Sequence, residues 1–171
     1  DAFHVLLSSI ELAKTGSGGL CASLLSHSIG APPINHFASA EIKEAVLTKI
    51  LSGEKISALA ITELTGGSDV AALQTKAVRD GDDYIVTGEK TFITSGIRAD
   101  YYTVAVRTDP EAKGPNGISM LLIDAHSAGI TKSKLDKMGW WASDTAHLHF
   151  DNVRVPAKNL LGAENMGFLV I

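Results

Sequence analysis

The chain has 171 residues, of which 45% are hydrophobic and 20% charged, and this length can bury a core in one domain or two small ones. A formal net charge of -4, with no run of basic residues, argues against a nucleic-acid partner. The single cysteine excludes a disulfide within the chain, and no apolar run approaches the ~20 residues of a transmembrane helix.

The first third of the sequence has the apolar period of α-helices. Residues 1–14 predict a helix with one apolar face, formed by Phe3, Leu6, Leu7, Ile10 and Ala13. A second short helix follows over residues 20–29, and the run Gly-Ala-Pro-Pro is expected to end it. Its inward residues are Leu20, Leu24, Leu25 and Ile29.

A third helix is predicted between two local signals. Ser39 is placed to cap its start, and Gly53 is placed to stop it. Its apolar stripe consists of Ile42, Ala45, Val46 and Ile50. Because the chain opens directly on a helical pattern and stops within the apolar stretch GFLVI, we expect it to be a piece of a longer protein.

At Ile56 the period changes from helix to strand. Short β-branched and aromatic runs separated by turn residues cover 56–62, 84–94, 101–108, 118–125, 129–135 and 146–155. The sequence RDGDD at residues 79–83 is a hairpin signal. Strands without intervening helices predict an antiparallel sandwich or barrel rather than a parallel nucleotide-binding sheet. With a further helix expected near Gly167, the fold class is α+β.

Several common kinds of site find no support. TGSGGL at residues 15–20 lacks the Lys-Ser/Thr pair of a phosphate-binding loop, and no strand precedes it. His147 and His149 share one face of a strand, but zinc needs three or four ligands and no third is in register. Ser, His and Asp are too scattered for a catalytic triad, and no G-x-S-x-G motif occurs.

Two predicted strands end in hydroxyls followed by glycine, in ITELTGGSD (61–69) and KTFITSG (90–96). If these strands are adjacent, their ends can form a platform for a planar heterocycle. The threonines would then bond its polar edge while Phe92 stacks on its face. From the residues alone a second interpretation stays open, in which both stretches are ordinary strand-end turns.

Three ordered motifs closely resemble the acyl-CoA dehydrogenase family of flavoproteins: ITELTGGSD, VTGEKTFITSG and KMGWWASDTAHLHFDNVRVPAKNLLG. The resemblance runs over essentially the whole chain. It implies a helical N-terminal domain, a central β domain and a C-terminal helical domain, with FAD bound between them and across a subunit interface. By this resemblance residues 1–55 belong to the N-terminal helical domain and 56–160 to the central β domain. Residues 161–171 are a linker and the start of the C-terminal helical domain, whose remainder lies outside this sequence.

The resemblance also implies a flavin site. Thr62 is expected to bond the pyrimidine side of the flavin, Phe92 to cover the face away from substrate, and Thr94 to bond near the reactive nitrogen. Gly67 and Ser68 fall where the family's loop approaches the FAD pyrophosphate and the thioester, which makes Ser68 a substrate-binding residue as well. The expected cofactor-binding residues are Leu59, Ile61, Thr62, Gly67, Ser68, Phe92, Ile93 and Thr94.

One residue departs from the family pattern. Leu64 stands where members usually have Pro after the Thr-Glu pair, and a proline would stiffen the turn. We therefore expect a slightly looser loop, with no ligand group removed.

The reaction that the resemblance implies is the α,β-dehydrogenation of an acyl-CoA thioester to a trans-2-enoyl-CoA, as in the β-oxidation of fatty acids. A glutamate removes the α proton while the β hydride passes to FAD. In known subfamilies that glutamate lies in the C-terminal domain, and no glutamate of this chain stands at a matching position. We assign no catalytic residue to this chain and expect it to be inactive alone. Two alternatives remain, a flavin-dependent oxidase or monooxygenase of the same superfamily and a catalytically inactive scaffold module.

Partners follow from the same resemblance. It implies an acyl-CoA substrate, an electron-transferring flavoprotein as acceptor and a homotetramer of full-length chains. The lone Cys21 and the lack of a visible signal segment fit a bacterial cytoplasm or a mitochondrial matrix. The segment from Leu24 to His27 corresponds to the floor of the acyl pocket in relatives, with ordinary helix packing as the alternative. We interpret Trp140 and Trp141 as filling the edge of a core rather than contacting the cofactor.

Overall fold

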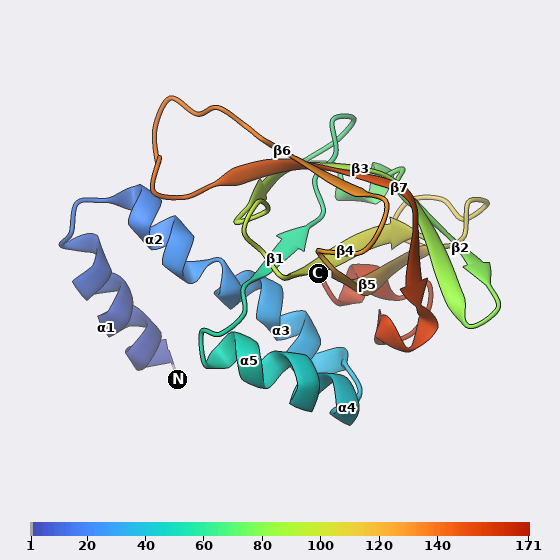
Figure 1. The fold of residues 1–171 in the computed structure, drawn as a ribbon, viewed down its shortest axis with the longest axis horizontal. Helices are drawn as coiled ribbons and strands as arrows, with labels where there is room; N and C mark the ends of the chain where they lie inside the picture. The colour runs from blue at the N-terminus through green and yellow to red at the C-terminus, as the bar shows by residue number, and fades with distance from the viewer. Residues whose placement is uncertain (1) are drawn as a thin grey trace.

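The computed structural model describes residues 2–171, apart from the side chain of His27, so the acyl-pocket expectation for that side chain lies outside the described residues. Helices cover one side of a strongly curved sheet (Figure 1). The helices are α1 Ala2–Ala13, α2 Gly18–Leu25, α3 His27–Phe37, α4 Ala40–Ile42 and α5 Thr48–Leu51, with a π-helical turn Lys43–Leu47 before α5. Among residues 2–171, none of these is long and apolar enough to cross a membrane.

The strands are β1 Ser57–Ala60, β2 Lys76–Asp80, β3 Asp83–Thr94, β4 Tyr101–Arg107, β5 Ile118–Asp124, β6 Ile130–Lys134, β7 Thr145–Pro156 and β8 Leu160–Leu161. Short 3₁₀ turns occur at Val70–Ala72, Ala157–Asn159 and Gly167–Leu169. The helix expected near Gly167 is thus only a single turn within the described residues.

The signals that bound the third predicted helix are confirmed. The side chain of Ser39 accepts a hydrogen bond from the backbone N–H of Ile42 at 3.3 Å, which satisfies a donor of the first turn. Gly53 ends the segment with a φ of 80°, where glycine carries no steric penalty. The inclusion of Ala45 in the apolar stripe was wrong, because the π-helical turn adds a residue and leaves Ala45 exposed while Leu47 is buried.

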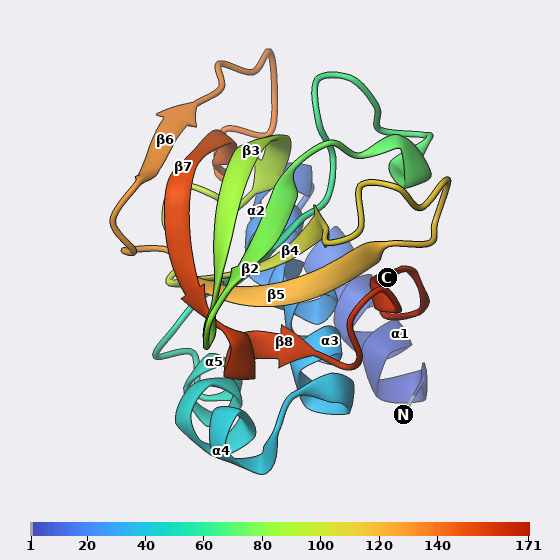
Figure 2. The ribbon, with the colours of Figure 1, turned by 90° about the vertical axis from the view of Figure 1, so that its right-hand side faces the viewer.

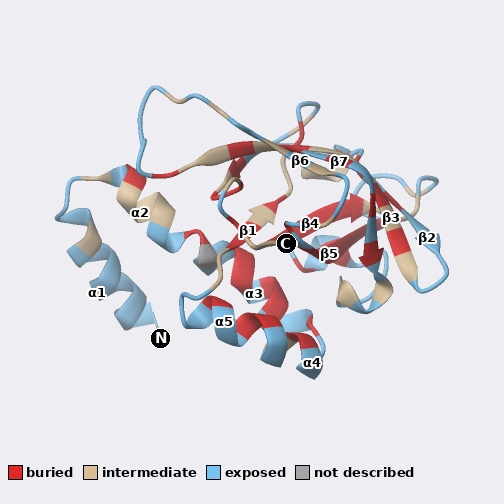
Figure 3. Ribbon diagram, in the orientation of Figure 1, coloured by how far each residue is buried: buried red, intermediate tan, exposed pale blue. Residues whose placement is uncertain are grey.

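The first helix is more exposed than its apolar pattern predicts. No residue of α1 is buried, and Phe3 and Leu7 are 75% and 60% exposed. Leu24 of α2 is likewise 47% exposed, so the inward face predicted for this helix is only partly covered. Figure 3 shows the reason, since α1 lies beside α2 rather than on the sheet.

The end predicted for the second helix is also wrong. After a break at Ser26 the chain begins α3, which continues through Pro32 and Pro33 to Phe37. Local sequence disfavours this, because proline lacks the N–H that an interior helical position uses. Packing overrides it: Gly30 lies so close to β1 that a Cβ there would come within 2.8 Å of Ser57 Oγ, and Ile34 is fully buried.

One eight-stranded sheet follows the order β6-β7-β3-β2-β4-β5-β8, with β1 added beside β4. Most pairs are antiparallel, as predicted, and the expected hairpin joins β2 to β3 with Asp80 opposite Asp83. Two of the described pairs are parallel: β1 runs parallel to β4 with Ser57 opposite Tyr101, and β2 meets β4 in parallel where Lys76 lies opposite Arg107. The β2–β3 hairpin lies in the chain between β1 and its neighbour β4.

The sheet curls around one apolar core and carries a second on its helical side. In the first, β3 and β7 cross over β4 and β5 (Figure 2), and Tyr84, Phe150, Val104 and Leu121 belong to one buried cluster. The second cluster joins the helices to the outer face of β4 and β5 and is represented by Ile34. Each such buried side chain contributes roughly 1.5–3 kcal/mol, so the helices are anchored to the sheet by packing.

Candidate functional site

The residue that follows β1 contacts β3 close to the end of that strand. Thr62 follows β1, Thr94 is the last residue of β3, and the backbone N–H of Thr91 donates to the carbonyl oxygen of Thr62 at 2.8 Å. Both threonine residues are partly exposed, and within the described part of the chain neither hydroxyl has a hydrogen-bond partner. Two free hydroxyls on these two segments are therefore available to a ligand.

Phe92 is held outward by a bulge in β3. The pairing of β3 with β7 shifts register between Lys90 and Ile93, and Phe92 within this bulge has a φ of 58° and is 66% exposed. The left-handed region is unusual for an aromatic residue and costs of order 1–3 kcal/mol. Such strain is concentrated at functional sites, and here the Phe92 ring is exposed at the surface two residues before the end of β3.

The apolar members of the predicted flavin set are placed differently from the threonines. Ile93 is 2% exposed and belongs to the β core, so only its backbone can reach a ligand. Leu59 and Ile61 are partly buried against the cluster that joins the helices to the sheet. These residues support the strand ends from below.

The loop after Thr62 folds back over that residue. Glu63 and Gly66 exchange backbone hydrogen bonds of 3.1 and 3.2 Å, which close a tight turn. A Cβ on Gly67 would lie 3.4 Å from Thr62 Cγ2, and a Cβ on Gly66 would lie 3.0 Å from the carbonyl oxygen of Asp69. Close approach of the chain to itself therefore accounts for Gly66, whereas a Cβ on Gly67 would make only an ordinary contact, and Gly67 and Ser68 remain exposed.

A buried ion pair lies under this loop, and sequence reasoning missed it. Lys90 Nζ is 2.7 Å from Glu63 Oε1, and the two side chains are 0% and 4% exposed. Burial lowers the pKa of Lys90 to about 8, an effect that the charge of Glu63 partly offsets. Burial opposes ionisation of Glu63 too, but the charge of Lys90 and the hydrogen bonds it receives hold its pKa below the ordinary value. One signal was visible, since Lys90 shares the inward register of Tyr84 and Val86.

Helix α2 is fastened to the chain just beyond Thr94. Ser95 Oγ donates to Ser26 Oγ at 2.8 Å, and Ser95 itself has a φ of 62°. Arg98 donates to the carbonyl oxygen of Ser23 at 3.1 Å and lies 3.0 Å from the carboxylate of Asp144. The segment expected to floor the acyl pocket is thereby tied to the end of β3.

The interpretation of the two tryptophans as core filler was wrong. Trp140 and Trp141 are 63% and 80% exposed. Trp140 lies against the start of α2, where a Cβ on Gly18 would come within 2.7 Å of its indole nitrogen and a Cβ on Gly19 within 2.9 Å of its backbone. The aromatic loop therefore packs on glycines of the helical layer, and most of its ring surface is open.

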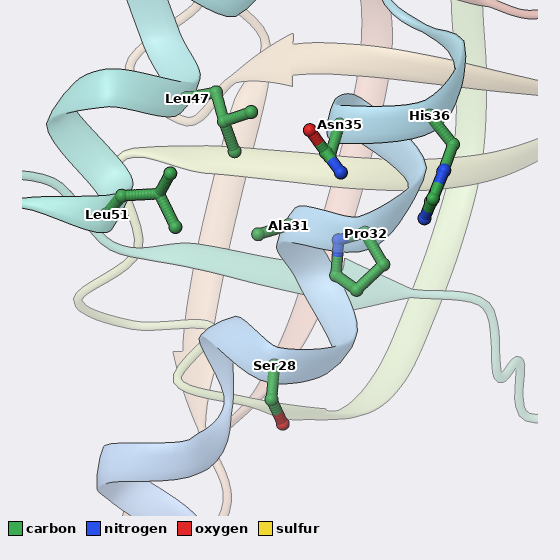
Figure 4. A pocket seen from close by; sticks show the side chains of 7 residues that line it. All are labelled: Ser28, Ala31, Pro32, Asn35, His36, Leu47 and Leu51. Atoms are coloured by element: carbon green, nitrogen blue, oxygen red, sulfur yellow. The ribbon is translucent and has the colours of Figure 1, made fainter. Parts of the chain in front are cut away.

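Other clusters do not compete with the strand ends as a site. Among the described residues no group of three or more His, Cys, Asp and Glu could hold a metal, and His147 lies 3.3 Å from Glu89. A hollow of about 300 Å³ between α3 and the turn before α5 is lined by Ala31, Leu47 and their neighbours (Figure 4). It belongs to the helical layer and contains none of the predicted flavin residues.

The chain matches known proteins over most of its length. The sequence model of the acyl-CoA dehydrogenase middle domain matches residues 58–153. Cyclohexane-1-carbonyl-CoA dehydrogenase of Geobacter metallireducens is 42% identical over 155 residues, which cover 88% of this chain and 40% of that protein. The crystal structure of a probable acyl-CoA dehydrogenase from Mycobacterium abscessus is 53% identical with a TM-score of 0.87, covering 90% of this chain and 41% of that one. A structure described as an electron transferring flavoprotein of Acidaminococcus fermentans is 41% identical with a TM-score of 0.80, covering 82% and 37%.

The chain therefore belongs to the acyl-CoA dehydrogenase family, as the three motifs indicated. It spans about two fifths of the length of the curated relatives it matches. The residues present suit the flavin that the family binds: two free hydroxyls, an outward aromatic ring and a glycine loop over one of the hydroxyls. These groups offer hydrogen bonds to a polar heterocycle, a surface for its face and close backbone approach for a phosphate.

Proposed function

We propose that the full-length protein is an FAD-dependent acyl-CoA dehydrogenase that converts an acyl-CoA thioester to the trans-2-enoyl-CoA. The observation that carries the proposal is that Thr62, with an unpartnered hydroxyl, is bonded through its carbonyl oxygen to Thr91 of β3, the strand that goes on to the exposed Phe92 and the unpartnered hydroxyl of Thr94. Family membership and the names of the relatives support the substrate class.

In this proposal the residues of the chain bind and orient. Thr62 and Thr94 donate hydrogen bonds to the flavin, Phe92 covers one face of its ring, and the backbone at Gly67 and Ser68 approaches the pyrophosphate, with Ser68 also touching the thioester. Leu59, Ile61 and Ile93 hold the strand ends in place. FAD, when bound, would supply the hydride acceptor.

The proposal places the catalytic base outside these 171 residues. Glu63 is committed to a buried ion pair, Glu89 lies beside His147, and Glu41 lies 2.9 Å from Lys158 on the surface. The division into 1–55, 56–160 and 161–171 as parts of three domains belongs to the proposal as well. So does the inactivity of this piece alone.

Partners and location are proposed on the same basis. An electron-transferring flavoprotein would accept the electrons, and the likeness to the Acidaminococcus fermentans structure supports this class of partner. A homotetramer in a bacterial cytoplasm or mitochondrial matrix is the expected assembly and place.

The test is to assay the full-length protein, reconstituted with FAD, against a panel of saturated acyl-CoA thioesters with an artificial electron acceptor. Formation of the 2-enoyl-CoA supports the proposal. The product is identified by a mass two units below that of the substrate, and its formation requires no oxygen. An oxygenated product, or reduction of oxygen without the acceptor, would move the assignment to a monooxygenase or oxidase. If the protein formed no product and bound no FAD, the result would favour a catalytically inactive scaffold module.

A further inference from the structure

The loop that carries Gly67 and Ser68 begins and ends at one carboxylate. Glu63 Oε2 accepts a hydrogen bond from the backbone N–H of Gln74 at 2.6 Å, and Oε1 accepts one from the N–H of Thr75 at 2.9 Å. Glu63 stands before the loop, and Gln74 and Thr75 stand after it. A single buried side chain therefore joins the two ends of residues 64–73.

Lys90 connects this closure to β3. Its ammonium donates to Glu63 Oε1 at 2.7 Å and to the carbonyl oxygen of Ile61 at 3.0 Å. Thr75 adds a second link, because its hydroxyl donates to the carbonyl oxygen of Glu89 at 3.0 Å. The strand that holds Lys90 goes on to Phe92 and Thr94, so the loop and both strand ends share one buried polar junction.

The buried ion pair is not explained by its contribution to stability alone. The free-energy cost of desolvating two charges offsets much of their electrostatic attraction, and proteins with well-packed apolar residues in place of such a pair are often as stable. An apolar pair here would, however, leave the N–H groups of Gln74 and Thr75 and the carbonyl of Ile61 without these partners. What the ion pair adds is a fixed geometry for three backbone segments.

We propose that Glu63 and Lys90 act as a clasp, a pair of positioning residues that set the loop 64–73 relative to Thr62 and Thr94. The clasp places Gly67 and Ser68 for the FAD pyrophosphate at the same time as the threonines meet the ring. Both side chains are buried, so they act through the backbone that they hold. This inference rests on the proposed function for the identity of the ligand.

The test uses the full-length protein and the variants Glu63→Gln and Lys90→Met, with Val155→Ala as the control. Val155 is a buried residue opposite Tyr84, at the far end of the β3–β7 pairing, so its truncation disturbs the core and spares the clasp. Two quantities are measured: the FAD dissociation constant, and hydrogen exchange of the FAD-free protein in residues 64–75. The double variant Glu63→Leu/Lys90→Met removes both charges together. It takes the place of a single variant in both measurements if that single variant does not fold.

The clasp predicts FAD binding weakened by about tenfold or more in each clasp variant, because charge-assisted hydrogen bonds that order the loop are lost. In the clasp variants hydrogen exchange should accelerate in residues 64–75 and stay slow in the β core. Val155→Ala should leave the FAD dissociation constant and the exchange of residues 64–75 near their wild-type values. Clasp variants that lose stability but keep the FAD affinity and loop protection of the control would overturn the inference. A wild-type protein that binds no FAD would instead defeat the proposed function, and the exchange data would still decide whether the pair orders the loop.

Discussion

The carbonyl oxygen of Thr62 accepts a 2.8 Å hydrogen bond from the backbone N–H of Thr91, although β1 and β3 are not neighbours in the sheet. β1 pairs with β4, while β3 pairs with β2 and β7. This contact sets the residue after β1 against β3 three residues before Thr94, so the candidate site combines two segments that do not pair in the sheet.

Removing either hydroxyl should weaken flavin binding without disturbing the fold. Thr62→Val and Thr94→Val keep the side-chain shape and delete one partly exposed donor. We expect each to raise the FAD dissociation constant by about tenfold, the value of one hydrogen bond to a ligand, and to shift the visible bands of bound FAD. Thr131→Val, an exposed threonine on β6, is the control. Equal affinity in all three variants would exclude the threonines from the site.

Phe92 should show a trade between stability and binding. Phe92→Gly relieves the φ of 58° and is expected to stabilise the FAD-free protein by about 1 kcal/mol in urea unfolding, while weakening FAD binding through loss of the ring. Phe92→Ala keeps a Cβ in the strained conformation and loses the ring, so it should weaken binding without the gain in stability. A destabilised glycine variant would show that the backbone conformation is not strained.

The buried ion pair should make stability depend on acid pH through Glu63. Its pKa is lower in the folded protein than the ordinary 4.5, so its contribution is present above that pH and is lost as the pH falls through the folded-state pKa. At neutral pH Glu63→Gln should cost about 3–5 kcal/mol, because it leaves Lys90 buried without its counter-charge. Urea unfolding from pH 7 to 3 should show the gap between wild type and variant narrowing below pH 4.5. A gap independent of pH would contradict the ionised pair.

The contact between α2 and the aromatic loop should be sensitive to a single methyl group. A Cβ on Gly19 would lie 2.9 Å from the backbone of Trp140, so Gly19→Ala forces one of the two segments to move. We expect a loss of about 1–3 kcal/mol, as for other overpacked sites. Gly139→Ala is the matched control: no heavy atom lies within 4 Å of its added Cβ. It should stay within about 0.5 kcal/mol of wild type in the same unfolding measurement.

Local signals in the sequence predicted the elements that local chemistry decides. The cap at Ser39, the stop at Gly53 and the hairpin at residues 79–83 follow from turn and capping preferences, and the strands follow from short β-branched and aromatic runs between turn residues. The continuation of α3 through Pro32 could not be predicted in this way, because its cause is packing on β1.

The candidate site divides along the same line. Its residues came from motif resemblance, but the contact between Thr62 and Thr91 joins segments that do not pair in the sheet, and no local pattern encodes it. The positive φ of Phe92 arises from a bulge against β7, far along the chain. The partner of Lys90 likewise comes from the loop after β1, so the register of Lys90 shows that it is buried and not what balances its charge.

The most direct test of the account is an anaerobic titration of the full-length protein, reconstituted with FAD, with a panel of acyl-CoA thioesters while the visible flavin band is recorded. If the full-length protein is an acyl-CoA dehydrogenase, FAD binds and one class of thioester bleaches the band. Bound FAD that no thioester bleaches would contradict the proposed dehydrogenation. A protein that binds no FAD would show that the loop after Thr62 is only a turn.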